Sequence, residues 1–282
     1  MVGMLAILIL HFVTYESSYS MNSPLEAALP SYRVYQPPFY QKLKLGFIFW
    51  FTYSMQMFVL WPFMILLFCI KRYSFTDIFK VREEFFRTIE VPERPYILCT
   101  NHLTWIDPFL IAWVVAPPWR AVFRPSIFPW GITGARYSKN WFFKIIFVMT
   151  RTIIVAASQA INQNSWKFLS SSYVLNLGHP ILIFPEGTRS ENGMVNVNNP
   201  TSGAGFLIKT VPKAQIICAY LRPDTAKTKV NFPKAKSKIH FNFKLIEIPE
   251  KTIQELSSKE ITKKVLDNIA DLEKDYQQKY GR

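Results

Sequence analysis

Several features that often decide a protein's class are missing from this sequence. Its three cysteines, Cys69, Cys99 and Cys218, lie far apart in apolar surroundings among 282 residues. An odd number of cysteines without metal-ligand spacing indicates buried free thiols in a reducing compartment. No cluster of cysteines and histidines has the spacing of a zinc site, so we predict no metal.

Acidic residues are scarce compared with basic ones. The chain has 33 lysines and arginines against 19 aspartates and glutamates, which gives a net charge of +14. Such charge attracts nucleic acid or an anionic membrane surface. The basic residues are scattered, without a block of five or six, and they accompany a long apolar segment. This combination favours a membrane partner over nucleic acid.

No charged residue appears between Leu45 and Ile70. This run exceeds the roughly 20 apolar residues that a helix needs to cross a bilayer. Basic residues flank both ends, so the positive charges do not set an orientation; they are Lys42, Lys44, Lys71 and Arg72. Because Pro62 can divide the run, the sequence leaves two arrangements open. One is a shallow hairpin with both ends on the cytoplasmic face, and the other is a single kinked span.

The chain begins with MVGMLAILILHFV, which is apolar but short and lacks a basic start. A signal peptide needs that basic start, so we interpret the stretch as an interfacial segment. Residues 14–40 are polar and contain prolines, which is typical of a linker. The predicted organisation is an N-terminal segment and linker (1–40), hydrophobic membrane-associated helices (41–85) and a further domain (86–282).

Beyond Lys71 the pattern indicates an α/β fold, with a mixed, largely parallel sheet flanked by helices. Short β-favouring runs alternate with helical stretches such as 158–177; the runs are 96–100, 152–156, 181–185 and 215–221. Residues 238–246 alternate strictly between apolar and polar, which predicts a strand with one solvated side that includes His240. Ser257 and Glu260 form a capping box ahead of a final amphipathic helix.

Two strand ends hold the candidate chemistry, because ligands gather at the carboxyl ends of strands in open α/β sheets. The first is followed by NHLTWID, in which His102 and Asp107 are five residues apart. A carboxylate beside a histidine fixes its tautomer and lets it act as a general base. The alternative is that Asp107 only caps a helix and His102 packs in the loop.

This pair lacks a nucleophile of its own, since the chain has no GxSxG elbow and no serine stands out beside it. We therefore expect the substrate to supply the nucleophile, as a hydroxyl that His102 deprotonates. The second strand end is followed by EGTRS. There Gly187 frees the backbone, Glu186 can organise the loop, and Arg189 offers a planar fork for phosphate. The alternative is an ordinary turn with an exposed arginine.

Together NHLTWID and FPEGTRS resemble the first and third motifs of the glycerophospholipid acyltransferases. The resemblance covers the chain from about Pro92 to its end. It implies that an acyl chain moves from coenzyme A or acyl carrier protein to a free hydroxyl of a lysophospholipid. It also implies that His102 is the base, that Asp107 is its partner, and that the acceptor is bound by four residues: Glu186, Gly187, Thr188 and Arg189.

Other family motifs are only partly present. Of the second motif, residues 145–151 keep Arg151, with Ile145 at the glycine position. We interpret Arg151 as a further phosphate ligand, and a structural ion pair is the alternative. Gln215 and Cys218 stand where a fourth motif has prolines, which leaves the acceptor's head group open.

The sequence thus predicts a membrane-bound O-acyltransferase, most simply one that makes phosphatidate from 1-acylglycerol 3-phosphate. We expect no prosthetic group, an acyl thioester as co-substrate, a phospholipid surface as partner, and a catalytic domain on the cytoplasmic side of the membrane. Three alternatives remain: the same reaction on another lysolipid, a hydrolase or transacylase with the same dyad, and a non-catalytic basic protein that binds membranes.

Overall fold

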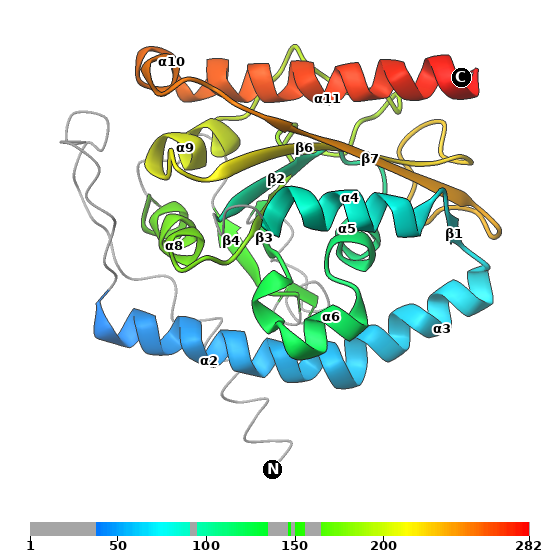
Figure 1. Cartoon of the computed structure of the whole chain (residues 1–282), viewed down its shortest axis with the longest axis horizontal. Helices are drawn as coiled ribbons and strands as arrows, with labels where there is room; N and C mark the ends of the chain where they lie inside the picture. Colours follow the sequence, from blue (N-terminus) through cyan, green and yellow to red (C-terminus); the bar gives the residue numbers. More distant parts are fainter. Residues whose placement is uncertain (1–37, 91–94, 135–145, 148–149, 156–164, 282) are drawn as a thin grey trace.

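The computed structural model of this chain describes residues 38–90, 95–134, 146–147, 150–155 and 165–281 (Figure 1). The predictions for the apolar start, for most of the 14–40 linker, for Ile145 and for a helix over 158–164 lie outside these residues.

Within the described residues, seven strands form one mixed sheet in the order β1-β7-β6-β2-β5-β3-β4. In chain order they are β1 (Ser74–Phe75), β2 (Tyr96–Thr100), β3 (Trp130–Gly134), β4 (Thr152–Val155), β5 (Ile181–Ile183), β6 (Gln215–Pro223) and β7 (Lys238–Ile246). The block from β6 to β4 is parallel throughout, and β7 is antiparallel to β6. The predicted mixed, largely parallel sheet is confirmed.

Alternate residues of β2 point into two separate cores, one on each face of the sheet. Leu98 packs in the same cluster as Phe85 and Leu110. Its neighbours Ile97 and Cys99 belong instead to the second cluster. Since both faces are buried, β2 is apolar without interruption, as the strands of covered parallel sheets are.

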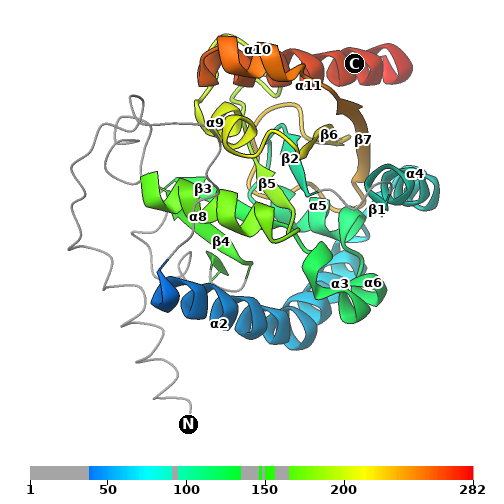
Figure 2. The ribbon, with the colours of Figure 1, turned by 60° about the vertical axis from the view of Figure 1, so that its left-hand side comes forward.

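Helices cover both faces of this sheet (Figures 1 and 2). Along the chain they are α4 (Ile78–Glu90), α5 (Asp107–Val115), α6 (Pro118–Phe123), the 3-10 turn η4 (Pro125–Ile127), α8 (Ser165–Asn176), α9 (Gly203–Thr210), α10 (Glu250–Glu255) and α11 (Ser258–Tyr280). The predicted boundary between residues 85 and 86 falls inside α4.

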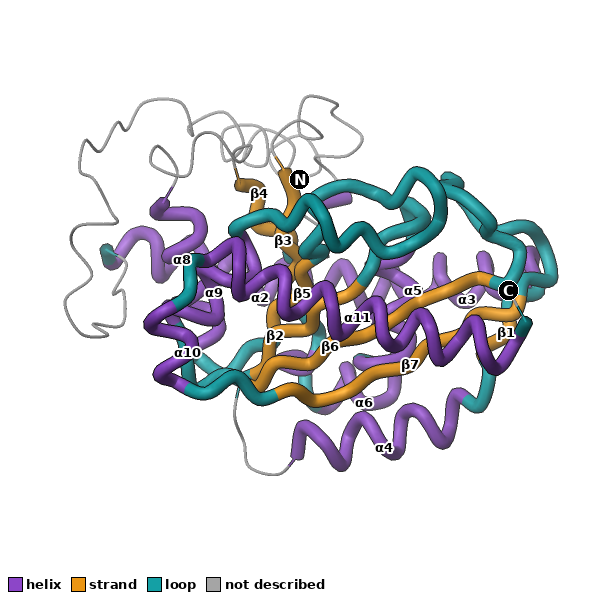
Figure 3. The backbone as a smooth tube through the Cα atoms, turned by 90° about the horizontal axis from the view of Figure 1, so that it is seen from above, coloured by secondary structure: helices purple, strands orange, loops and turns teal. Residues whose placement is uncertain are grey.

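The final helix, α11, crosses β6 and β7 (Figures 1 and 3). The predicted capping box is present, because Ser257 Oγ accepts from Glu260 N and the Glu260 carboxylate accepts from Ser257 N. The prediction that one side of β7 is solvated was wrong. His240 lies on that side, its ring centroid 4.9 Å from that of Tyr276 on α11, and burial lowers its pKa to about 4.

The apolar run forms one continuous helix over Phe39–Lys71, made of α2 (Phe39–Met55), the π turn η3 (Gln56–Leu60) and α3 (Trp61–Lys71). Pro62 lies in the first turn of α3, immediately after the π turn. In that turn Trp61 N donates to Gln56 O, five residues back, so the helix continues past the proline with a bend instead of ending. The hairpin arrangement is therefore not what the structure has.

This helix lies along the domain beneath β4 and α6 (Figures 1 and 2). Its inner side belongs to both cores, through Leu45, Ile48, Phe49, Leu60, Trp61, Met64 and Phe68. Its outer side exposes Leu43, Phe47, Trp50, Phe58, Phe63, Leu66 and Ile70. The helix is long and apolar enough to cross a membrane, yet the domain covers one side of it along most of its length.

Candidate active site

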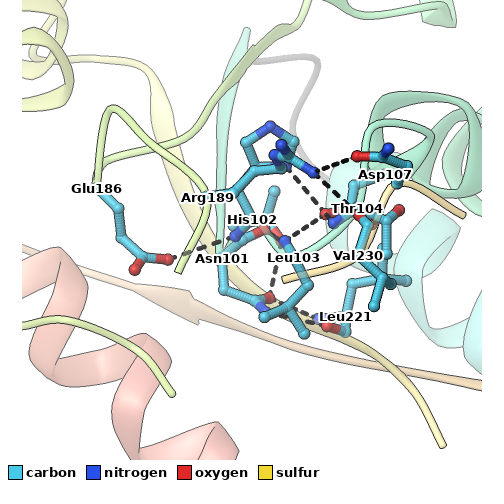
Figure 4. Close-up of polar contacts among 11 residues, drawn as sticks. Asn101, His102, Leu103, Thr104, Asp107, Glu186, Arg189, Leu221 and Val230 are labelled. Atoms are coloured by element: carbon cyan, nitrogen blue, oxygen red, sulfur yellow. Dashed lines mark hydrogen bonds and ion pairs between the residues drawn. The ribbon is translucent and has the colours of Figure 1, made fainter. Parts of the chain in front are cut away.

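The two motifs meet because β2 and β5 are parallel neighbours in register, with Cys99 opposite Ile183. His102 follows β2 and Glu186 follows β5, so both leave the sheet at the same edge. His102 N donates to Glu186 Oε1 over 3.3 Å, and Ser190 N donates to His102 O over 2.8 Å (Figure 4). Residues more than eighty positions apart therefore form one site.

His102 and Asp107 form the predicted dyad. The Nδ1 atom of His102 lies 2.9 Å from Asp107 Oδ2. The imidazole also stacks on the Phe184 ring, with centroids 4.1 Å apart. About a fifth of the histidine side chain is exposed, and its Nε2 makes no hydrogen bond with any described residue. A proton held on Nδ1 by the carboxylate leaves Nε2 as the basic atom that faces a substrate.

Asp107 also builds the loop that holds this histidine. Its side chain is only 1% exposed, and its Oδ2 accepts from Leu103 N (2.6 Å) and Thr104 N (2.7 Å). Thr104 Oγ1 donates to Oδ1 over 2.5 Å. Asp107 opens α5 as expected, but these bonds do more than cap a helix, because they also fix the backbone immediately after His102.

Asn101 was missed by the sequence analysis, although it lies within NHLTWID. Its Nδ2 donates to Leu221 O over 2.9 Å, and its Oδ1 accepts from Leu221 N over 2.8 Å. The side-chain amide thus pairs with the backbone of β6 as a further strand residue would. This pairing extends the sheet by one residue and fixes the position of the backbone that leads into His102.

Glu186 has its carboxyl group turned inward and is only 6% exposed. Oε1 accepts from His102 N and Oε2 accepts from Asn196 N at 3.2 Å. Burial raises its pKa to about 7, against the lowering effect of these two amide donors. The contacts are those of a loop organiser, and its predicted part in acceptor binding is untested.

Gly187 and Thr188 are exposed at the turn after β5. Gly187 has a φ of +68°, and a Cβ there would come within 2.4 Å of Thr201 Cγ2. Both the conformation and the space require glycine at this position. Their predicted contact with the acceptor stays a prediction.

Arg189 lies beside the dyad and is held by a loop that sequence reasoning did not identify (Figure 4). Its Nη1 donates to Val230 O (3.0 Å) and to Asn231 Oδ1 (3.3 Å), and its guanidinium lies 5.2 Å from the Trp105 ring centroid. Its Nε and Nη2 have no hydrogen-bond partner among the described residues, so this side of the fork can bind an anion.

A family model described as Acyltransferase matches residues 78–222, which is just over half of the chain and includes both motifs. The chain belongs to the acyltransferase family. It is therefore an acyltransferase, as predicted, and the non-catalytic alternative is set aside.

Comparison with known proteins adds a structural likeness for this acyltransferase. No curated protein matches the chain. Among solved structures it is similar to the 1-acyl-sn-glycerophosphate (LPA) acyltransferase PlsC from Thermotoga maritima. The two chains share 15% sequence identity with a TM-score of 0.49, over 84% of this chain and 97% of that one.

Arg151 of this acyltransferase does not join the other predicted residues. It precedes β4, so it lies at the amino edge of the parallel strands, and it is 0% exposed. Nε donates to Thr52 Oγ1 of α2 (3.0 Å), Nη1 donates to Pro125 O (2.7 Å), and the Phe49 ring lies 4.3 Å away. Burial lowers its pKa to about 9.

These contacts fit neither interpretation of Arg151 from the sequence. Among the described residues no carboxylate pairs with it, so it is not in an ion pair there. A phosphate ligand at the acceptor site would need to reach the opposite edge of the sheet. Arg151 instead anchors the long helix to the domain. The described residues also hold no group of three histidines, cysteines or acidic residues placed to bind a metal.

Proposed function

We propose that this acyltransferase moves an acyl chain from a thioester, acyl-CoA or acyl-ACP, to the free hydroxyl of a lysophospholipid. The preferred acceptor is 1-acylglycerol 3-phosphate, and the product is then phosphatidate. The observation that supports this best is the combination of an exposed Nε2 on His102 with an arginine fork beside it, on Arg189.

In the proposed reaction, His102 Nε2 takes the proton of the acceptor hydroxyl while the hydroxyl oxygen attacks the thioester carbonyl carbon. The new C–O bond forms, the C–S bond breaks, and the thiolate leaves with the proton that the imidazolium returns. Asp107 stabilises the imidazolium between these two transfers. Arg189 holds the acceptor phosphate so that the hydroxyl is placed at Nε2.

A serine hydrolase or transacylase would use the same dyad but needs a serine to acylate. Ser190, the serine inside EGTRS, directs its hydroxyl to Asn192 Oδ1 and Met194 O, and only its backbone amide contacts His102. This engagement favours direct attack by the acceptor. A different lysolipid acceptor remains the second candidate, because the same arginine fork suits any phosphate-bearing head group.

The exposed side of the long helix is proposed to lie in the membrane interface. Trp50, Phe58 and Leu66 are 63%, 79% and 57% exposed, and their apolar neighbours continue along the same side. Such a face, with the opposite side packed on a domain, fits a helix that lies in the membrane surface. Exposed Trp119 and Phe123 of α6 extend it, since Tyr53 OH on α2 donates to Val122 O. The net charge of +14 suits the anionic cytoplasmic leaflet.

The acceptor is tested with purified protein, labelled acyl-CoA or acyl-ACP, and a panel of acceptors. The panel holds lysophosphatidate, lysophospholipids with larger head groups, and the phosphate-free monoacylglycerol. We expect lysophosphatidate to have the highest kcat/KM and monoacylglycerol to be poor. Equal use of monoacylglycerol would rule out phosphate recognition, and preference for a larger head group would favour the second candidate.

Membrane attachment is tested by salt extraction and by the substitution of one exposed residue. The wild-type protein should stay with membranes in high salt and need detergent for release. Trp50→Glu should weaken retention because it places a charge in the apolar face. The same charge introduced by Gln278→Glu, on the exposed side of α11, should not. Release of the wild type by salt alone would contradict burial of this face.

A further inference from the structure

The C-terminal helix α11 places a carboxyl group inside the domain, close to the loop that follows EGTRS. Glu273 is only 4% exposed. Its Oε2 accepts from Val195 N over 2.9 Å, and its Oε1 accepts from Tyr220 OH of β6 over 3.2 Å. Glu273 lies well beyond residues 78–222 that the acyltransferase family model matches.

The segment that Glu273 holds is also held from its other end. Arg222 donates to Gly193 O, and its Nη1 lies 4.0 Å from Glu273 Oε1. Gly193 has a φ of +74°, and a Cβ there would come within 2.1 Å of Lys227 O. Residues 193–196 are therefore clamped by Glu273 and Arg222 against the loop that carries Val230 and Asn231.

Consecutive amides of this segment connect the helix to the catalytic loop. Val195 N donates to Glu273, and the next amide, Asn196 N, donates to Glu186 Oε2. Glu186 in turn accepts from His102 N through its other oxygen. Two buried acidic side chains and one short segment thus link α11 to the backbone of the base.

Stability alone gives a poor account of this arrangement. Burial raises the pKa of Glu273, and the donors from Val195, Tyr220 and Arg222 only oppose that effect. A buried ion pair is often no more stabilising than apolar side chains of similar volume. What such a group does well is fix geometry, because each of its partners has one place to bind.

We propose that Glu273 is a positioning residue for acyl transfer. It fixes segment 193–196, and through Glu186 it sets the place of His102 and of the EGTRS loop that presents Arg189. The helix α11 is then part of the support of the active site. This inference rests on acyltransferase activity and not on which lysolipid is the acceptor.

The variants Glu273→Gln and Tyr220→Phe test it, with Asp275→Asn as control. Asp275 is exposed on the same helix and has no hydrogen-bond or ion-pair partner among the described residues. The acceptor is whichever lysolipid the wild-type enzyme uses best, so failure of the lysophosphatidate assignment leaves this test intact. Glu273→Gln should lower kcat/KM about ten- to a hundredfold, as misplacement of reacting groups does, and should raise the acceptor KM. Asp275→Asn should match wild type.

A purely structural role would lower the active fraction, and with it the apparent kcat, but would leave KM unchanged. Hydrogen exchange gives a second readout, because the amides of Val195 and Asn196 should exchange faster in Glu273→Gln and not in Asp275→Asn. Unchanged exchange there, or an unchanged acceptor KM, would overturn the proposal. Should Glu273→Gln fail to fold, Tyr220→Phe decides by the same two measurements.

A double-mutant cycle separates positioning from general damage. If Glu273 acts through Glu186, the double variant Glu186→Gln/Glu273→Gln should lose much less kcat/KM, relative to wild type, than the product of the two single losses. Fully multiplicative effects would show that the two residues act independently, which would contradict the connection through residues 195 and 196.

Discussion

Arg189 and Arg151 lie at opposite edges of one sheet, and the two arginine side chains have different environments and partners there. Arg189 follows β5 at the carboxyl edge, is partly exposed, and donates from Nη1 to Val230 O and Asn231 Oδ1. Arg151 precedes β4 at the amino edge and is fully enclosed by Thr52, Pro125 and aromatic rings. The first can meet a ligand, and the second holds a helix.

This contrast shows what the position of a residue relative to its strand determines. In a parallel sheet the residues that follow strands share an edge, and those that precede strands share the other. The carboxyl edge of this protein is rich in groups that bind or react. At the amino edge beside α2, Arg151 instead makes anchoring contacts to Thr52 and Pro125. Activity should therefore be sensitive to changes at the first edge, and stability to changes at the second.

The largest effect should come from the base at the carboxyl edge. His102→Ala should lower kcat/KM by ~100- to 10,000-fold, the range of general-base assistance. Asp107→Asn should also lose much activity because it favours the wrong tautomer. Initial rates with a labelled thioester measure both, and circular dichroism checks the fold. A folded His102→Ala variant within a few-fold of wild type would exclude the dyad mechanism.

Glu186 at the same edge should make stability depend on pH. Its pKa is raised from 4.5 to about 7 in the folded protein, so its contribution to stability is fully present below pH 4.5 and is lost as pH rises through 7. The difference corresponds to about 3 kcal/mol. Urea unfolding between pH 4.5 and 8 should show this loss in wild type and in Glu191→Gln, an exposed neighbour. Glu186→Gln should lack it, and parallel curves for all three would refute the buried acid.

Arg189→Lys keeps the charge but removes the planar fork. We expect kcat/KM for the acceptor to fall about ten- to over a hundredfold, since a charge-assisted hydrogen bond is worth roughly 1.5–3 kcal/mol. The KM for the thioester should hardly change, because Arg189 is proposed to bind only the acceptor. A loss shared equally by donor and acceptor would argue against that division.

Arg151→Met should give the smallest effect on activity. It leaves Thr52 Oγ1 and Pro125 O without their donor, so the free energy of unfolding should fall by about 1–3 kcal/mol. Thermal unfolding measures this loss of stability, and kcat/KM should stay within a few-fold of wild type. A kinetic defect as large as that of Arg189→Lys, with unchanged unfolding, would return Arg151 to the acceptor site.

Much of the fold could be predicted because its strands have strong local patterns. The runs at 96–100 and 238–246 coincide with β2 and β7, since an uninterrupted or strictly alternating apolar pattern over five or more residues is distinctive. β1 is only two residues long, and β3 contains Gly131 and Gly134, so neither gives such a pattern. What covers β7 was also not predictable from that strand, because the cover comes from α11.

The site could be predicted as far as its contacts are local. His102 and Asp107 share one loop, and their spacing indicates their contact. Asn101 contacts Leu221, 120 positions away in the sequence, and Arg189 contacts Val230, 41 positions away. No sequence spacing predicts either contact. Arg151 is different, because its place ahead of the predicted strand at 152–156 already indicated the amino edge.

The in-register pairing of β2 with β5 determines which changes of length this enzyme can tolerate. The chain between the two motifs can gain or lose residues at little cost, because the free energy of closing a loop grows only slowly with its length. One residue added between Cys99 and His102, or between Ile183 and Glu186, would instead rotate a side chain to the wrong face and separate His102 N from Glu186. Among relatives, the distance between the motifs is thus free to vary, and the count from each strand to its motif is not.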